Sequence, residues 1–68
     1  MDIQQILARN MRRLRKELRL SQEKLAFEAG LHRTYISGVE RCVRNPTITG
    51  LAKIAEGLKV SPSKLLEE

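Results

Sequence analysis

Residues 21–40, SQEKLAFEAGLHRTYISGVE, decide the fold of this chain. Ser21 is a good helix N-cap, and Glu23 falls in the first turn of the helix that follows, near the positive end of its dipole. Gly30 stands where this helix must end, because glycine adopts the left-handed conformation of a helix C-cap at low cost. The stretch therefore predicts two short helices joined by a tight turn at residues 29–31.

The second of these helices, expected over residues 33–41, has two chemically different sides. Ile36 and Val39 form its apolar side, and Leu31 should plug the turn into the core. The opposite side carries, at helical spacing, Thr34, Ser37, Gly38 and Arg41. Two short helices joined in this way form the helix-turn-helix unit, which places its second helix in the major groove of DNA.

The rest of the chain predicts three further helices and no strand. A first helix over residues 2–18 places on one face Leu7, Met11, Leu14 and Leu18. A fourth helix, capped by Thr47, has at helical spacing Ile48, Leu51, Ile54, Ala55 and Leu58. Ser61 and Pro62 open a short fifth helix, because Pro is favoured at the first helical position. We therefore predict an all-α chain of five helices.

Length and charge limit the class of protein. A chain of 68 residues allows a single domain, residues 1–68, with one small core. Lys and Arg number 13 against 8 acidic residues, so the formal charge is +5 and a polyanionic partner is favoured over a surface that is merely soluble. Phe27 and Tyr35 are the aromatic residues. So few stacking platforms argue against binding of single strands and leave double-stranded DNA.

Several other functions are not expected. Cys42 is the one cysteine and His32 the one histidine, so neither a disulfide nor a metal site is predicted, and we expect no cofactor. The scattered carboxylates supply no set of acid, base and nucleophile, so we do not expect an enzyme or a small-molecule ligand. No apolar run approaches the roughly 20 residues that a membrane span needs. The first residues differ from a signal peptide, so we expect no membrane contact and a cytoplasmic protein.

The polar side of the second short helix suits a major groove. Arg33 can donate two hydrogen bonds to guanine, and Thr34 and Ser37 can bond to several base edges. Gly38 lies among them, and its missing side chain would let the backbone approach DNA closely. The alternative is that Gly38 only weakens the helix, by about 1 kcal/mol.

Phosphate contacts are expected at both ends of the unit. Gln22 begins the first short helix, where exposed backbone N–H groups favour an anion. Arg41, Arg44 and Asn45 flank the other end and would hold a second phosphate. The alternative for these charges is a solvated loop.

An ordered series of short motifs is shared with a known family. The motifs are Leu20-Ser21-Gln22, Leu25-Ala26, Ala29-Gly30-Leu31, Tyr35-Ile36-Ser37, Val39-Glu40-Arg41, Asn45-Pro46 and Leu51-x-x-Ile54-Ala55. As a set, spread over about residues 7–66, they resemble the Cro and phage-repressor type of helix-turn-helix domain. Within that family, residues 32–41 are most similar to the small controller proteins of restriction–modification systems. The resemblance implies a lambda-repressor-like fold and a stand-alone dimeric regulator.

The resemblance also implies roles for single residues. The family places against the bases Arg33, Thr34, Ser37 and Gly38. It places near the sugar-phosphate backbone Gln22, Tyr35, Arg41, Arg44 and Asn45. It further implies an ion pair between Arg15 and Glu40, which makes physical sense because an unpaired Glu beside DNA would repel phosphate. The alternative is a solvated Glu40.

The chain departs from the family where helices end. Arg19, Cys42 and Lys59 occupy positions that commonly hold Gly. A side chain in a left-handed cap costs on the order of 1 kcal/mol, so these loops are either built differently or less stable. Cys42 is interpreted as a small cap residue, with a redox role as the alternative. His32 stands where Asp, Ser or Thr would cap the next helix better.

We therefore predict sequence-specific binding of double-stranded DNA by a homodimer that regulates transcription. Two copies would read a pseudo-palindromic operator with half-sites about one helical turn apart. Candidate dimer residues are Val60, Leu65 and Leu66, unless they complete the core. The narrower prediction is control of restriction–modification genes. The alternatives are an antitoxin that represses its own operon and a coactivator that bridges proteins, for which the arginine-rich first helix is the relevant feature.

Overall fold

The computed structural model describes residues 2–68, which form four α-helices and one short 3₁₀ turn. In chain order these elements are α1 (Ile3–Glu17), α2 (Gln22–Ala29), α3 (Arg33–Glu40), α4 (Ile48–Gly57) and η1 (Pro62–Leu66). The all-α class is as predicted, but the expected fifth α-helix is the 3₁₀ turn η1. Five residues that begin with Pro are too few to continue as an α-helix, and the amide of Lys64 bonds instead to the carbonyl of Ser61, three residues earlier.

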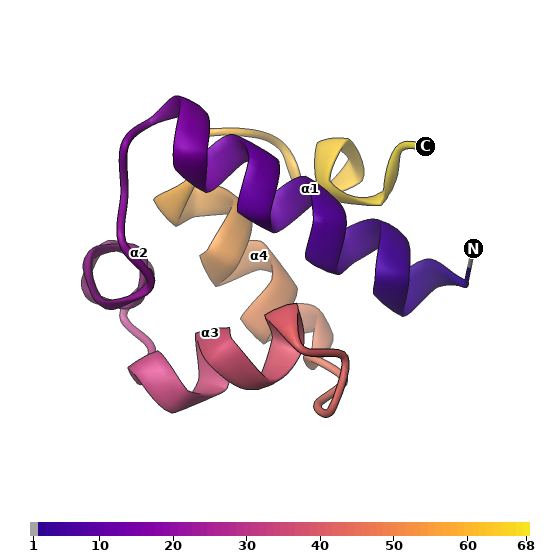
Figure 1. The fold of residues 1–68 in the computed structure, drawn as a ribbon, viewed down its shortest axis with the longest axis horizontal. Helices are drawn as coiled ribbons and strands as arrows, with labels where there is room; N and C mark the ends of the chain where they lie inside the picture. The colour runs from indigo at the N-terminus through magenta and orange to yellow at the C-terminus, as the bar shows by residue number, and fades with distance from the viewer. Residues whose placement is uncertain (1) are drawn as a thin grey trace.

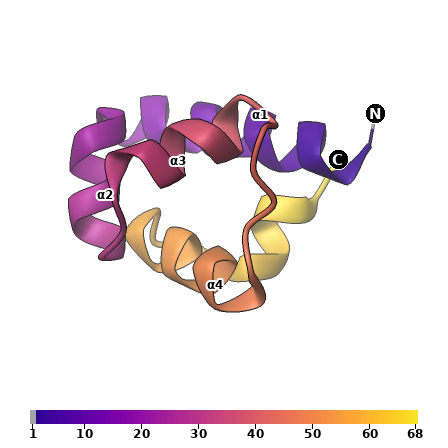
Figure 2. The same ribbon diagram turned by 90° about the horizontal axis from the view of Figure 1, so that it is seen from below.

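The helices enclose one core (Figure 1). α1 lies along one edge of that view, α3 along the opposite edge, and α2 is seen end-on beside them. Seen from below, α4 and η1 form the layer opposite α1 and α3 (Figure 2). α2 packs against both α3 and α4, and η1 packs against both α1 and α4. The two ends of the chain therefore lie at the same end of the molecule, away from α2.

The core is built mainly from the apolar positions that the helical spacing predicts. Its buried members are Leu7, Met11, Leu14, Leu25, Ala26, Ile36, Val39, Ile54, Ala55, Leu58 and Leu65. Two predicted core residues are outside it: Leu18 is 40% exposed and Ile48 is 89% exposed. Leu18 is the C-cap of α1 and Ile48 is the first residue of α4, so both lie where the chain turns and the helical spacing no longer sets the side-chain direction.

All four α-helices end in the same way. Gly30, Arg19, Cys42 and Lys59 each adopt a left-handed conformation, with φ between 58° and 71°. At every one of these ends the next amide reaches back five residues, as from Leu20 to the carbonyl of Arg15. This is the Schellman arrangement, which satisfies the last free carbonyls of a helix. The caps without Gly therefore have the ordinary geometry, at a cost on the order of 1 kcal/mol each.

Two N-cap residues predicted from the sequence form hydrogen bonds at the start of their helices. Ser21 accepts a hydrogen bond from the amide of Lys24 at 3.0 Å, and Thr47 accepts one from the amide of Gly50 at 2.9 Å. His32, at the start of α3, makes no such bond. The helix that carries the polar side is therefore the one with the weakest N-cap. Among the helices of residues 2–68, none is long and apolar enough to cross a membrane.

Candidate nucleic-acid interface

The outward side of α3 presents the side chains that the sequence predicts to read bases. Arg33 and Thr34 are exposed, and Ser37 is half-buried on the same side. Arg41 follows the last turn of α3 and is exposed as well. The apolar residues Ile36 and Val39 are buried on the inner side of the helix, so burial of one side of α3 leaves the polar side free.

Gly38 is covered by the loop that follows α3 and is not open on this outward side. It is buried, and a Cβ at this position would lie 3.3 Å from the Cβ of Arg44 and 3.8 Å from the Cγ2 of Val43. The amide of Val43 also bonds to the carbonyl of Gly38 at 3.0 Å. The expectation that Gly38 opens the helix to DNA therefore does not agree with the structure. Its missing side chain makes room for the loop that follows α3.

Arg15 and Glu40 form an ion pair between α1 and α3. The Nε and Nη2 atoms of Arg15 donate to the two carboxylate oxygens of Glu40 at 2.9 and 3.0 Å. Glu40 is only 4% exposed, so its charge depends on these partners. Arg15 also donates to the carbonyl of Leu20 at 3.0 Å, which ties the turn between α1 and α2 to the same pair.

Gln22 takes part in the same network rather than standing free. Its Nε2 donates to Glu40 at 3.1 Å, which gives the carboxylate a third donor. Gln22 also lines a hollow of about 560 Å³ at the start of α2, together with Arg15, Ser21, Glu23 and Arg33. Gln22 and Arg33, which the sequence assigns to backbone and bases respectively, thus line the same hollow.

At the other end of the unit, Tyr35 links α3 to the start of α4. Its hydroxyl accepts a hydrogen bond from the amide of Thr47 at 3.2 Å, and a Cβ at Gly50 would clash with that hydroxyl. The guanidinium of Arg44 lies over the Tyr35 ring, 5.1 Å from its centre. Arg44 is exposed, so its charge is held beside α3 by an aromatic ring and not by an acid.

Asn45 is exposed, and its side-chain oxygen accepts a hydrogen bond from Nε2 of Gln4. This bond joins the loop between α3 and α4 to the first turn of α1. Part of the hydrogen-bonding capacity of the Asn45 side chain is therefore already used within the chain.

The C-terminal residues divide between core and surface. Leu65 is fully buried, so its assignment to a dimer surface is wrong: it anchors η1 in the core beside α1 and α4. Val60 is half-buried and packs against the same core. Leu66 is 36% exposed and is the most exposed of the three candidates.

Asn10 and Arg12 on α1 are polar residues whose contacts sequence reasoning missed. Asn10 is buried and donates to the carbonyls of Leu65 and Glu67, both at 2.8 Å. Arg12 donates to the carbonyl of Glu40 at 2.7 Å. Asn10 was detectable as a polar residue between apolar positions of a helix, but its partners are more than 50 residues away in the chain.

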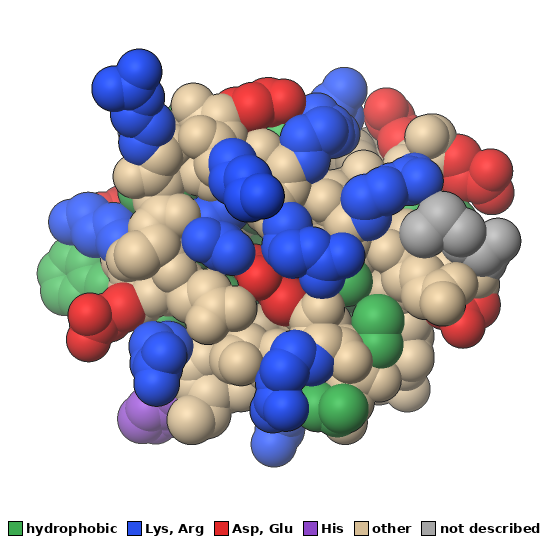
Figure 3. Space-filling model, in the orientation of Figure 1, with side chains coloured by type: hydrophobic (Ala, Val, Ile, Leu, Met, Phe, Trp, Pro, Cys, Tyr) green, Lys and Arg blue, Asp and Glu red, His purple; other side chains and the backbone are tan. Residues whose placement is uncertain are grey.

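Positive charge dominates the face formed by α1 and α3. In Figure 3, Lys and Arg side chains spread over this face, and most acidic side chains in view lie near its outline. Glu40, at the end of α3, is neutralised by Arg15. An exposed polar side of a short helix, set on a basic face and supported by a preceding helix, defines the class of helix-turn-helix DNA-binding proteins.

Comparison with known proteins agrees with this class. Residues 11–65 match the Helix-turn-helix family model, and the chain belongs to this family of DNA-binding transcription regulators. It is 53% identical over 66 residues to control protein C.SmaI of Serratia marcescens, a match that spans 97% of this chain and 79% of that protein.

Solved structures agree as well. The hypothetical transcription factor NHTF from Neisseria is 42% identical with a TM-score of 0.93, over 97% of this chain and 76% of that one. The restriction-modification controller protein C.AhdI from Aeromonas hydrophila is 40% identical with a TM-score of 0.87. That match spans 91% of this chain and 94% of the controller.

Proposed function

We propose that this protein is a homodimeric regulator that binds a pseudo-palindromic operator and controls the genes of a restriction–modification system. The observation that carries the proposal is the outward side of α3, where Arg33 and Thr34 are exposed and Ser37 is half-buried beside them. The similarity to control proteins favours this role over an antitoxin or a bridging coactivator. An operator-binding protein acts in the compartment that holds the DNA, so we assign it to the cytoplasm.

In this proposal Arg33, Thr34 and Ser37 read the edges of the bases. Arg33 would donate two hydrogen bonds to a guanine, and the hydroxyls would bond to neighbouring bases or contact a thymine methyl. Gly38 is left out of this set, because it is covered by the loop after α3.

The sugar-phosphate backbone would be held on both sides of α3. On one side are Gln22 and the free amides of the first turn of α2, where the helix dipole favours an anion. On the other side are Tyr35, Arg41, Arg44 and Asn45. Tyr35 accepts a bond from Thr47 through its hydroxyl oxygen, so its own proton is available to a phosphate.

The dimer surface is proposed at the end of the molecule where both termini lie. A mostly apolar hollow of about 190 Å³ is lined there by Ile3, Leu7, Pro46, Leu51 and Leu66, with Gln4 and Asn45 at its polar side. Ile48, one turn before Leu51, adds an almost fully exposed apolar side chain. A second copy seated here would cover Ile48 and Leu66, which the core leaves in water.

The test is to sequence the DNA fragments that the purified protein selects from a random pool at a stated salt concentration. We expect a two-fold symmetric site whose half-sites are centred about 10 base pairs apart. Sedimentation at the same concentrations should show a dimer. Selection of a single asymmetric site, or a monomer bound to it, would contradict the dimeric operator.

The genes that flank the coding sequence decide the regulated system. Restriction and modification genes beside the selected operator are expected. A toxin gene in that place would favour the antitoxin, and tight capture of a protein partner with no selected site would favour the coactivator.

A further inference from the structure

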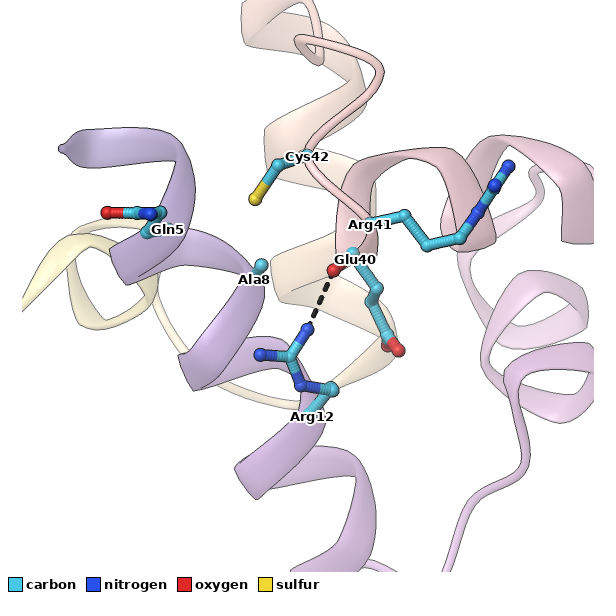
Figure 4. A pocket seen from close by; sticks show the side chains of 6 residues that line it. All are labelled: Gln5, Ala8, Arg12, Glu40, Arg41 and Cys42. Carbon is cyan, nitrogen blue, oxygen red and sulfur yellow. Dashed lines mark hydrogen bonds between the residues drawn. The ribbon is translucent and has the colours of Figure 1, made fainter. Parts of the chain in front are cut away.

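A third hollow lies between α1 and the end of α3. It has a volume of about 330 Å³ and is lined by Gln5, Ala8, Arg12, Glu40, Arg41 and Cys42 (Figure 4). It is next to the hollow that Gln22 and Arg33 line, because Arg15 and Gln22 of that hollow both donate to Glu40.

Arg12 is held in this hollow by the end of α3. Its Nη1 donates to the carbonyl of Glu40 at 2.7 Å, shown as the dashed line in Figure 4. This carbonyl belongs to the last turn of α3, where a cation is favoured by the helix dipole. One nitrogen is therefore occupied, and the remaining N–H groups of the guanidinium have no hydrogen-bond partner among residues 2–68.

The hollow carries net positive charge. Its one carboxylate, Glu40, is already bonded to Arg15 through two oxygens and to Gln22. The Cys42 thiol is directed to the carbonyl of Gln4 at 3.7 Å. The small side chain of Ala8 leaves room beside Arg12.

Arg41 stands at the rim. Its side chain runs outward from the end of α3, away from the hollow (Figure 4). It follows Arg33 and Ser37 at intervals of four residues, so it continues the outward side of α3. A DNA strand that contacts this side would pass the mouth of the hollow.

We propose that this hollow binds a phosphate of the DNA backbone, with Arg12 as the fixed donor and Arg41 at the rim. The assignment rests on the proposed DNA-binding function and adds Arg12 to it. A guanidinium that is already oriented by one hydrogen bond loses little side-chain freedom when its free N–H groups bind the phosphate oxygens.

The main experiment compares Arg12→Gln with Arg13→Gln as a matched control. Both remove one charge from adjacent positions of α1, but Arg13 is paired with Glu17 and lies outside the hollow. We expect Arg12→Gln to make the slope of log affinity against log salt shallower by about 0.9 per protomer, because one phosphate contact is lost. The slope of Arg13→Gln should be close to that of the wild type.

A loss of α3 stability would weaken binding at all salt concentrations and leave the slope unchanged. An unchanged slope for Arg12→Gln, or an equal change in both variants, would overturn the proposal.

A second measurement uses the unaltered protein and inorganic phosphate. The Nε–H resonance of Arg12 should shift and saturate during titration, while that of Arg13 stays near its starting position. Suppose that the Arg12 resonance shifts with phosphate but the salt slope of Arg12→Gln equals that of the wild type. The hollow would then bind free phosphate and not the DNA backbone, which would overturn the backbone assignment. Uniform shifts of all arginines would overturn the site itself, even if Arg12→Gln failed to fold.

The two measurements also separate this inference from the proposed function. If the wild type selects an operator while both readouts at Arg12 are negative, the hollow is not a phosphate site and the function stands. If the wild type selects no operator but Arg12 responds to phosphate, then the regulator function fails and the backbone assignment fails with it, which leaves an anion site of another kind.

Discussion

Arg15 of α1 holds both carboxylate oxygens of Glu40 at the end of α3, at 2.9 and 3.0 Å. The pair joins α1 to α3 through two residues that are 25 positions apart in sequence. It also keeps a negative charge that lies beside the proposed interface from facing DNA unpaired.

Arg15→Ala should therefore destabilise the fold strongly. The substitution leaves the carboxylate of Glu40 almost fully buried, and Gln22 is then its remaining side-chain donor. Breaking a buried ion pair in this way costs about 3 kcal/mol. The free energy of unfolding in urea measures the loss. Arg13→Ala breaks the exposed pair with Glu17 and should cost no more than about 0.5 kcal/mol. Equal costs for the two variants would show that the Arg15–Glu40 pair adds no more stability than a surface pair.

Arg33→Ala should relax the choice of base. The substitution removes the exposed guanidinium at the start of α3 and with it the proposed bonds to a base. The binding free energy should become less favourable by about 1–3 kcal/mol on the selected operator and change little on random DNA. Competition between operator and random duplex at fixed salt gives both numbers. Equal losses on the two duplexes would move Arg33 from the bases to the backbone.

Arg44→Ala should weaken binding to every sequence alike. Its guanidinium is held over the Tyr35 ring and has no ion-pair partner among residues 2–68, so it is available to a phosphate. The slope of log affinity against log salt should become shallower by roughly one. Lys53→Ala, which removes an exposed charge from α4, is the control and should leave the slope near its original value. An unchanged slope for Arg44→Ala would exclude a phosphate contact.

Lys59→Gly should stabilise the protein. Lys59 has a φ of 63°, and glycine would relieve up to about 1 kcal/mol of strain at this helix end. Lys53→Gly makes the same change inside α4, where glycine should cost about 1 kcal/mol. Urea unfolding of both variants should therefore give changes of opposite sign. A destabilised Lys59→Gly would show that its side chain contributes more than the left-handed backbone costs.

Ile48→Asp should give a folded monomer. Ile48 is 89% exposed, so a charge there leaves the core intact and blocks only a surface that a second copy would cover. Phe27→Asp, at an exposed apolar residue on α2, is the control and should remain a dimer. Sedimentation velocity distinguishes the two states. A dimeric Ile48→Asp would place the dimer surface elsewhere.

Local signals predicted the helix-turn-helix unit closely. Ser21 and Gly30 bound α2, and Ile36 and Val39 are buried in α3, because caps and helical spacing act within one or two turns of chain. The helix ends without Gly were recognised from the family resemblance, which implies Gly at these positions. Arg19 and Lys59 adopt a positive φ there.

Contacts between distant residues were not predictable in this way. Gly38 was assigned to the reading side because its position on the helix is compatible with that side, yet the loop after α3 covers it. Leu65 was assigned to the surface, and η1 places it in the core. Ile48 has the spacing of a core residue but lies at the first turn of α4, beyond the reach of any neighbour that would bury it.

The sequence by itself determined the all-α class, the two short helices with their turn, and the set of polar side chains on α3, because each depends on interactions within a few residues. Only the tertiary structure decided four hydrogen bonds. Asn10 donates to the carbonyls of Leu65 and Glu67, Tyr35 accepts from the amide of Thr47 before α4, and Arg12 donates to the carbonyl of Glu40 at the end of α3. These contacts join residues between 12 and 57 positions apart, and they form only when burial of the common core brings those segments together.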